Sequence, residues 1–238
     1  DLSSNKLTRI HKDTVEGLTD HLNNFFLADN KLTSVPDLTG PKTLGSLRLQ
    51  GNRITDLSRI ATSGIGQVFE LVLTFNNITH INKRTFSGLS SLTTLDLSSN
   101  ELTYIHRGTV EGLTDKLNNL RLQENEITDL SRIATSGIEH VYDLVLTFNN
   151  ITHINKRTFS GLASLTTLLL IRNNLTFIAK DVFYETPRLK SLFLHSNAIT
   201  YIEKKTFDRL DLKQLTIFDN PLNSLPDGMF DEMANHTK

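Results

Sequence analysis

An asparagine that returns at almost constant spacing is the feature that most constrains the fold of this chain. Successive occurrences are 22 to 25 residues apart and extend along all 238 residues. We call them the ladder asparagines: Asn5, Asn30, Asn52, Asn76, Asn100, Asn125, Asn149, Asn173, Asn197 and Asn220. A period of this length indicates a solenoid, in which each repeat buries its apolar face against its neighbours. The chain is therefore predicted to be one domain, residues 1–238, of about ten repeats.

The residues ahead of each ladder asparagine follow the frame Leu-x-x-Leu-x-Leu-x-x-Asn, as in Leu92, Leu95, Leu97 and Asn100. Side chains alternate along a strand, so these leucines point to one face and the residues between them point to the other. Strands of successive repeats are expected to stack in parallel, about 4.8 Å apart. The asparagine follows at the turn, where its amide can satisfy backbone groups of adjacent repeats.

With this motif over essentially its whole length, the sequence resembles the leucine-rich repeat family. It is similar to the 24-residue subtype of animal extracellular proteins, in the style of Toll-type ectodomains and lamprey variable lymphocyte receptors. The subtype is indicated by a recurrent phenylalanine at Phe86, Phe159, Phe183, Phe207 and Phe230. The resemblance implies an α/β solenoid shaped as a horseshoe, with a parallel concave sheet of about ten strands and an irregular or short-helical convex side.

A longer period within the sequence, and the repeats at its two ends, bear on how this chain arose. Residues 52–97 recur with few changes as residues 125–170, an offset of three repeats. Recent duplication of a block and an engineered array both explain this. The first repeat is cut at Asp1 and the last stops at Lys238, and the chain has no cysteine. Extracellular members of the family usually carry cysteine-rich caps, so the resemblance implies that both end caps are missing and that the chain is a fragment.

Composition and motifs exclude several classes of function. The net charge is −1, so no excess of positive charge indicates a nucleic-acid partner. No apolar run approaches the roughly 18 to 20 residues that span a membrane. Phosphate loops, metalloprotease motifs and serine-hydrolase elbows are all missing. Acidic residues such as Glu70 and Asp143 recur a whole number of repeats apart, too far for paired acid–base chemistry. We therefore expect no catalytic residue, no metal site, no cofactor and no enzymatic activity.

The residues between the strand leucines are predicted to form columns on the concave face. Apolar side chains cluster there over the last four strands, and such clusters mark interaction sites. Charged side chains lie nearer the middle and would add selectivity. Alternatively, these apolar residues only favour strand formation and bind no partner. The candidate partner-binding residues are Phe26, Arg48, Val72, Asp96, Arg121, Val145, Leu169, Ile171, Phe193, His195 and Phe218.

Four sequences of the type Asn-x-Thr are candidate glycosylation sites, at Asn77, Asn150, Asn174 and Asn235. About four are expected by chance in a chain so rich in Asn, Ser and Thr. The first three directly follow a ladder asparagine, which would keep sugar away from the concave columns.

Together with the resemblance, these features predict a non-enzymatic, extracellular module, secreted or part of an ectodomain, that binds a protein through its concave face. Immune or pattern recognition and cell adhesion are both compatible with the family. A scaffold, a non-catalytic subunit or an enzyme inhibitor is the alternative. Neither nucleic acid nor membrane is expected to contact this segment, and the repeat pattern does not specify an oligomeric state.

Overall fold

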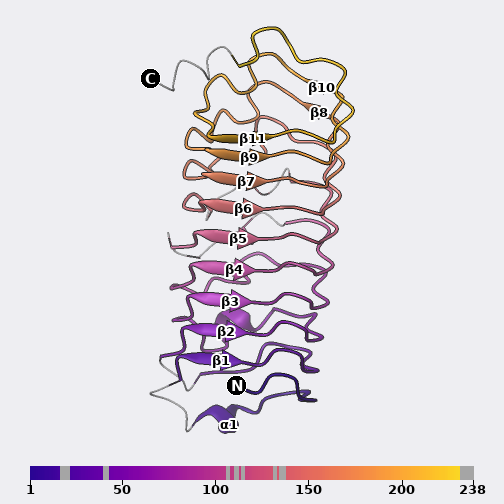
Figure 1. The fold of residues 1–238 in the computed structure, drawn as a ribbon. Coiled ribbons are helices and arrows are strands. Elements are labelled where there is room, and N and C mark those ends of the chain that lie inside the picture. Colours follow the sequence, from indigo (N-terminus) through magenta and orange to yellow (C-terminus); the bar gives the residue numbers. More distant parts are fainter. Residues whose placement is uncertain are drawn as a thin grey trace.

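The structure, a computed structural model, describes residues 1–16, 22–39, 43–105, 108–109, 113, 116–130, 133 and 138–230. Within these ranges the chain winds into a curved stack of coils, and successive coils contribute one short strand each to a common sheet (Figure 1). The strands of this sheet are β1 (Asn24–Phe26), β2 (Ser46–Arg48), β3 (Glu70–Val72), β4 (Thr94–Asp96), β5 (Asn119–Arg121), β6 (Asp143–Val145), β7 (Thr167–Leu169), β9 (Ser191–Phe193) and β11 (Gln214–Thr216).

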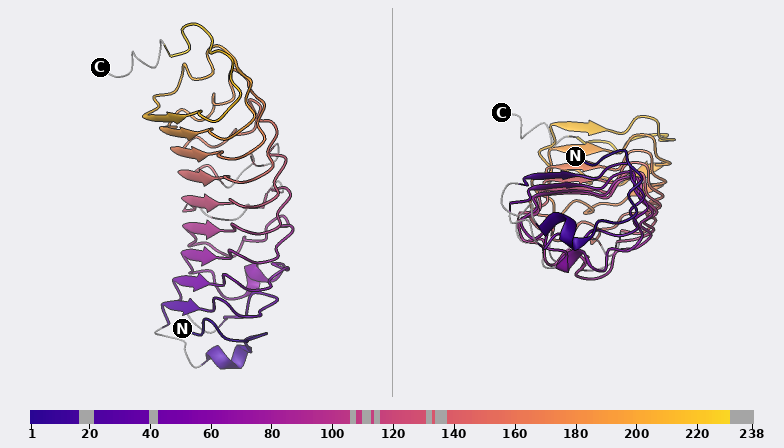
Figure 2. Two further views of the ribbon diagram at one scale, coloured as in Figure 1. Left: turned by 45° about the vertical axis from the view of Figure 1, so that its right-hand side comes forward. Right: turned by 90° about the horizontal axis from the view of Figure 1, so that it is seen from below.

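All neighbouring strands of this sheet are parallel and in register, so equivalent residues of successive repeats lie side by side, as Leu47, Leu71 and Leu95 do. Figure 2 shows the sheet on the inner side of the arc. The predicted leucine-rich repeat solenoid with a parallel concave sheet is therefore confirmed, with nine assigned strands in the described residues instead of about ten. The first repeat extends the bonding pattern without forming a strand, since Leu2 N–H donates to Phe26 O at 2.8 Å.

The convex side is irregular, as the resemblance implied. Its described helices are short: α1 covers Lys12–Glu16 and the 3₁₀ helix η1 covers Ile60–Thr62. Two further strands, β8 (Phe177–Ile178) and β10 (Tyr201–Ile202), pair in parallel away from the main sheet (Figure 1). Local structure on this side therefore varies from repeat to repeat, while the concave sheet stays regular.

The core is a continuous column between the sheet and the convex side. Strand leucines such as Leu71, Leu144 and Leu168 are fully buried. The buried rings of Phe159, Phe183 and Phe207 stack in sequence, with centroids 6.0 and 6.2 Å apart, and the exposed ring of Phe230 continues the stack at 6.4 Å from Phe207. Complete burial of one such side chain stabilises the fold by roughly 1.5 to 3 kcal/mol. Each repeat therefore depends on its neighbours for most of its burial.

The turn after each strand is built on its ladder asparagine. At Asn100 the side-chain Nδ2 donates to Leu73 O and Leu97 O, both at 3.0 Å, and Oδ1 accepts from Ile78 N–H at 3.0 Å. The same set of bonds recurs at Asn149. Each amide thus ties its own repeat to the one before it, through groups that would otherwise be buried without partners.

The residue before each ladder asparagine adopts a left-handed backbone conformation. The φ angles of these ten residues lie between 51° and 66°. Glycine or a small or polar side chain occupies most of the positions, as at Gly51 and Ser99, because the left-handed region is unfavourable for bulky residues. The exceptions with an aromatic ring are Phe75 and Phe148.

Candidate binding surface on the concave sheet

The predicted binding residues come from the outward-facing positions of the strands and from the residues just after them. Arg48, Arg121 and Phe218 are exposed. The half-buried members are Phe26, Val72, Val145, Leu169, Ile171, Phe193 and His195. Asp96 differs from the rest, because only 8% of its surface is accessible. Its carboxylate can meet a partner only through the groups that cover it.

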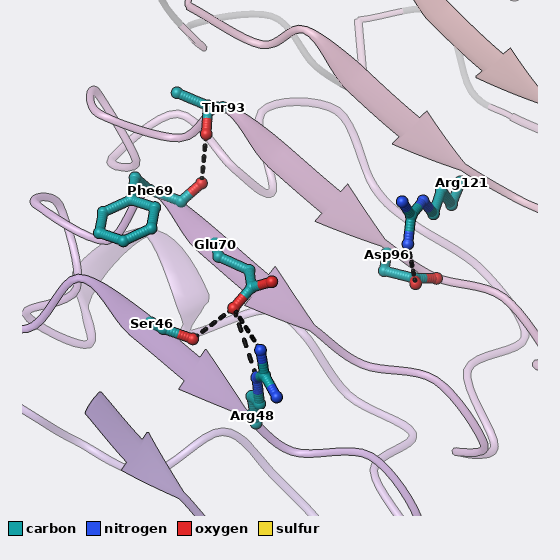
Figure 3. A network of polar contacts seen from close by, with 7 residues as sticks. All are labelled: Ser46, Arg48, Phe69, Glu70, Thr93, Asp96 and Arg121. Atoms are coloured by element: carbon teal, nitrogen blue, oxygen red, sulfur yellow. Dashed lines mark hydrogen bonds and ion pairs between the residues drawn. The ribbon is translucent and has the colours of Figure 1, made fainter.

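The N-terminal half of the surface is polar and internally paired. Arg48 donates to Glu70 Oε2 from Nε at 3.3 Å and from Nη2 at 3.2 Å, and the Ser46 hydroxyl donates to the same oxygen at 2.5 Å (Figure 3). The Arg48 guanidinium also lies over the Phe26 ring, 5.2 Å from its centroid. Four residues from three adjacent strands thus form one network.

This network changes the protonation of Glu70. The hydrogen bond from Ser46 holds the pKa of the Glu70 carboxyl below its ordinary value, and Arg48 lowers the pKa further. Partial burial acts in the opposite direction but is the weaker effect on balance. Glu70 is therefore a carboxylate at neutral pH whose charge is already compensated by Arg48.

Asp96 and Arg121 form the next pair along the sheet. Arg121 Nη1 lies 3.6 Å from Asp96 Oδ2 (Figure 3), and the Ser98 hydroxyl and backbone N–H both donate to Asp96 Oδ1. Arg121 reaches back toward β4 instead of forward to Asp143 on β6. Asp143, one methylene shorter than the equivalent Glu70, has no side-chain bond like that of Glu70 within the described part of the chain.

The C-terminal half of the surface is apolar. The side chains that we call the apolar patch are Val145, Leu169, Ile171, Phe193 and Phe218. They come from β6, β7, β9 and the segments after β7 and β11. Next to them, the His195 and Phe218 rings stack with centroids 4.3 Å apart, and His195 Nδ1 lies 2.7 Å from Thr216 Oγ1. The Phe218 ring is 64% exposed even so.

The duplicated blocks differ at this surface. Counting forward by 73 residues, Asp96 becomes Leu169 and Ser98 becomes Ile171, whereas the core leucines Leu95 and Leu97 become Leu168 and Leu170. Two repeats with the same core thus present an ion-paired carboxylate in one block and aliphatic side chains in the other. This change from polar to aliphatic residues is visible in the sequence when equivalent positions of the two blocks are compared, but not within a single column.

A shallow depression lies where the two halves meet. It has a volume of about 240 Å³, and its walls come from β5, β6 and β7. Arg121 and Asp143 line one part of it, and Val145 and Leu169 line another. The depression therefore combines charge with apolar surface, as protein-binding sites commonly do.

Three polar atoms on the same face lack partners. Gln50 Oε1, Gln123 Oε1 and Thr147 Oγ1 are buried, yet none accepts or donates a hydrogen bond within the described part of the chain. A buried polar atom without a partner costs free energy. None of these three residues is among the predicted partner-binding residues. Their shared feature, a polar side chain at the outward position just after a strand, was visible in the sequence.

Two exposed aromatic residues were also missed. Phe69 and Tyr142 directly precede β3 and β6, and both are exposed. The Phe69 ring lies against Gly45 of the preceding repeat, where any Cβ would collide with it. The prediction followed three outward columns, none of which included the residue directly before each strand, so this flanking column fell outside it.

The first three candidate glycosylation sites, Asn77, Asn150 and Asn174, are exposed at the turns next to the ladder. Asn77 Nδ2 donates to Glu101 Oε1 at 2.8 Å. The fourth candidate, Asn235, lies outside the described residues.

Across the described residues, no three acidic or histidine side chains converge as metal ligands would. Nor does any helix in those residues have the length and apolarity that a membrane crossing requires.

Comparison with known proteins bears on the family. A model of the leucine rich repeat family matches residues 66–115, 115–175 and 164–222, which together are more than half of the chain. The chain belongs to the leucine-rich repeat family. No curated protein sequence matches it.

Solved leucine-rich repeat structures agree with this assignment. A leucine-rich repeat protein of Leptospira interrogans is 30% identical with a TM-score of 0.83, and the match covers 98% of this chain and 57% of that one. The leucine-rich repeat part of FLRT2, solved in an octameric complex with Latrophilin 3 and Unc5D, is 28% identical with a TM-score of 0.83, covering 98% and 71%. A TLR13–ssRNA13 complex, at 20% identity and a TM-score of 0.73 over 94% of this chain and 39% of that one, shares the fold. This leucine-rich repeat chain thus spans little more than half of the Leptospira protein.

Proposed function

We propose that this chain is a non-catalytic, extracellular leucine-rich repeat module that binds a protein partner through the concave sheet, with the apolar patch as the centre of the contact. The paired charges of the N-terminal half would lie beside this centre. Recognition of a foreign molecule and adhesion between cells are the two roles that such a surface would serve.

The observation that carries the proposal is the difference between the duplicated blocks. Asp96 and Ser98 correspond to Leu169 and Ile171, and these two aliphatic residues join Val145 to Phe193 in one continuous apolar area. Both blocks have the same core, so folding does not require the change. Half-buried aliphatic and aromatic side chains in the middle of a surface are typical of the centre of a protein interface.

The charges favour a protein over a nucleic acid. Arg48 and Arg121 each face a carboxylate, Glu70 and Asp96 respectively, so neither offers an uncompensated charge to phosphate. The FLRT2 structure, in which a related repeat domain forms a complex with two other proteins, supports the same class of partner. The exposed sequences at Asn77, Asn150 and Asn174 support the extracellular setting.

The test is capture of a partner from extracellular and membrane extracts of the source organism, with three forms of the protein. The wild type should retain one or more proteins that the double variant Leu169→Asp, Phe193→Asp fails to retain. The double variant should keep the circular dichroism spectrum of the fold, because neither residue belongs to the buried column.

A control is Tyr184→Asp, which introduces one aspartate at an exposed aromatic residue outside the sheet. Binding should survive this change. Equal retention by the wild type and the double variant would refute the concave surface as the binding site. Loss of binding in both the double variant and Tyr184→Asp would indicate a nonspecific effect of added charge and would also count against the proposal.

A further inference from the structure

Phe75 and Phe148 are exposed aromatic residues whose presence packing does not explain. Both adopt the left-handed conformation, with φ of 53° and 55°, and their surfaces are 64% and 45% exposed. Serine occupies the equivalent position at Ser99 and Ser196. A bulky ring in this backbone conformation is uncommon, and an exposed ring gains no stability from the core.

Each ring lies two residues before an asparagine of the type Asn-x-Thr. Between Phe75 and Asn77 stands the ladder residue Asn76, which is buried and bonded to Leu49 O and Leu73 O. The middle side chain points inward, whereas both of its neighbours are exposed to solvent. The arrangement is the same at Phe148, Asn149 and Asn150.

We propose that Phe75 and Phe148 are stacking platforms for the first N-acetylglucosamine of N-linked glycans on Asn77 and Asn150. One face of a pyranose ring carries only C–H groups, which pack on the electron-rich face of an aromatic ring. The proposal rests on the extracellular setting of the proposed function, since only a chain that enters the secretory pathway acquires such glycans. It does not depend on which partner the concave sheet binds.

Attachment of the sugar is a substitution at its C1 atom. The asparagine Nδ2 bonds to C1 and loses one proton, and a lipid-linked diphosphate leaves; the secretory pathway supplies this donor and the transferase. The modified amide keeps one N–H, so Asn77 retains a donor for Glu101. The ring is left in place to cover the apolar face of the attached sugar.

The two platforms differ in accessibility. The Arg172 guanidinium lies over the Phe148 ring, 4.8 Å from its centroid, and occupies part of its surface. The residue equivalent to Arg172 beside Phe75 is Ser99, which is too short to cover a ring. We therefore expect the stronger sugar contact at Phe75.

The third exposed site offers an internal control. Two residues before Asn174 stands Arg172, so this sugar has no aromatic platform at the equivalent position. The variants Phe75→Ser and Phe148→Ser use the residue that other repeats carry at this turn, so they should fold. Arg172→Phe adds the missing ring beside Asn174.

The experiment uses protein secreted from eukaryotic cells and trimmed to a single N-acetylglucosamine at each site. In the proton NMR spectrum, the acetamide methyl signals of the sugars on Asn77 and Asn150 should move upfield, because each lies over a ring, while the signal from Asn174 should not. Each Phe→Ser change should return one signal to the unshifted position. Arg172→Phe should shift the third.

Stability gives a second measurement. Thr79→Ala prevents attachment at Asn77 and leaves the asparagine intact; it should lower the melting midpoint by roughly 2 °C in the wild-type background and by much less in the Phe75→Ser background. Attached sugars with unshifted methyl signals, or shifts that survive the Phe→Ser changes, would overturn this inference and leave the concave binding site intact. Secretion without any sugar at Asn77 and Asn150 would overturn it together with the support that these sites give to the extracellular setting.

Discussion

Two equivalent arginines, each on the strand just before one copy of the duplicated block, lie in different electrostatic situations. Arg48 pairs forward with Glu70, which the Ser46 hydroxyl also contacts. Its counterpart Arg121, 73 residues later, pairs backward with Asp96. In the first block the charges are neutralised within neighbouring strands, whereas in the second Asp143 faces a depression beside aliphatic side chains.

The difference shows that the surface residues of this repeat protein can change while its core residues stay the same. The buried leucines repeat almost without change because each repeat must pack on the next. The outward positions carry no such requirement, so one of them holds Asp96 in one block and Leu169 in the other. A binding surface can therefore be changed by substitutions that leave the stacking of repeats intact.

The largest expected effect on stability tests whether the apolar patch belongs to the surface or to the core. Leu168 and Leu169 are adjacent, but Leu168 is fully buried and Leu169 is half-buried on the concave face. Leu168→Ala should lower the free energy of unfolding by about 2 to 5 kcal/mol, and Leu169→Ala by about 1 kcal/mol or less. Urea unfolding measures both. Equal losses would show that Leu169 is a core residue and would remove the patch from the binding surface.

Next in expected size is loss of a ladder asparagine in each half. Asn100→Ala strands the Ile78 N–H and the Leu73 and Leu97 carbonyls, and Asn149→Ala does the same for the equivalent groups. Each change should lower the free energy of unfolding by about 1 to 3 kcal/mol, because buried polar groups lose their partners.

The two losses should agree, since Asn100 and Asn149 are both buried and make the same set of hydrogen bonds. Thermal melting of protein made without glycosylation is the measurement, and Asn150→Ala, at an exposed neighbouring asparagine, is the matched control. A melting midpoint unchanged by both ladder substitutions would contradict the structural role of the ladder. A large difference between them would contradict the equivalence of the two halves.

The fold was predictable because its determinants repeat. The spacing of asparagines such as Asn76 and Asn100 indicated the coil, and strand alternation indicated which residues face outward. The direction in which each arginine pairs was not predictable, because it depends on side-chain length and on neighbours from two adjacent repeats. Arg121 turns toward Asp96 partly because Asp143 is shorter than Glu70. Such contacts belong to the three-dimensional stack and have no signature within one repeat.

The smallest expected effect tests the Arg48–Glu70 network through the pH dependence of stability. The pKa of Glu70 is lower in the folded protein than its ordinary value of 4.5, first because of the Ser46 hydroxyl and also because of Arg48. The carboxylate therefore stabilises the fold above that pH, and this contribution is lost as the pH falls through the folded-state pKa. Glu70→Gln should lower stability at pH 7 by only a few tenths of a kcal/mol, about the value of an exposed ion pair.

The decisive feature is how that small difference depends on pH. Melting curves of the wild type and Glu70→Gln should differ at pH 7, and the difference should shrink as the pH falls below 4.5 and through the lower folded-state pKa of Glu70. Asp143→Asn, at the equivalent position 73 residues later, is the matched control for loss of one carboxylate outside the Arg48–Glu70 network. If the stability difference caused by Glu70→Gln persisted unchanged to pH 3, the charge of Glu70 would not be its source. The electrostatic contrast between the two halves would then be wrong.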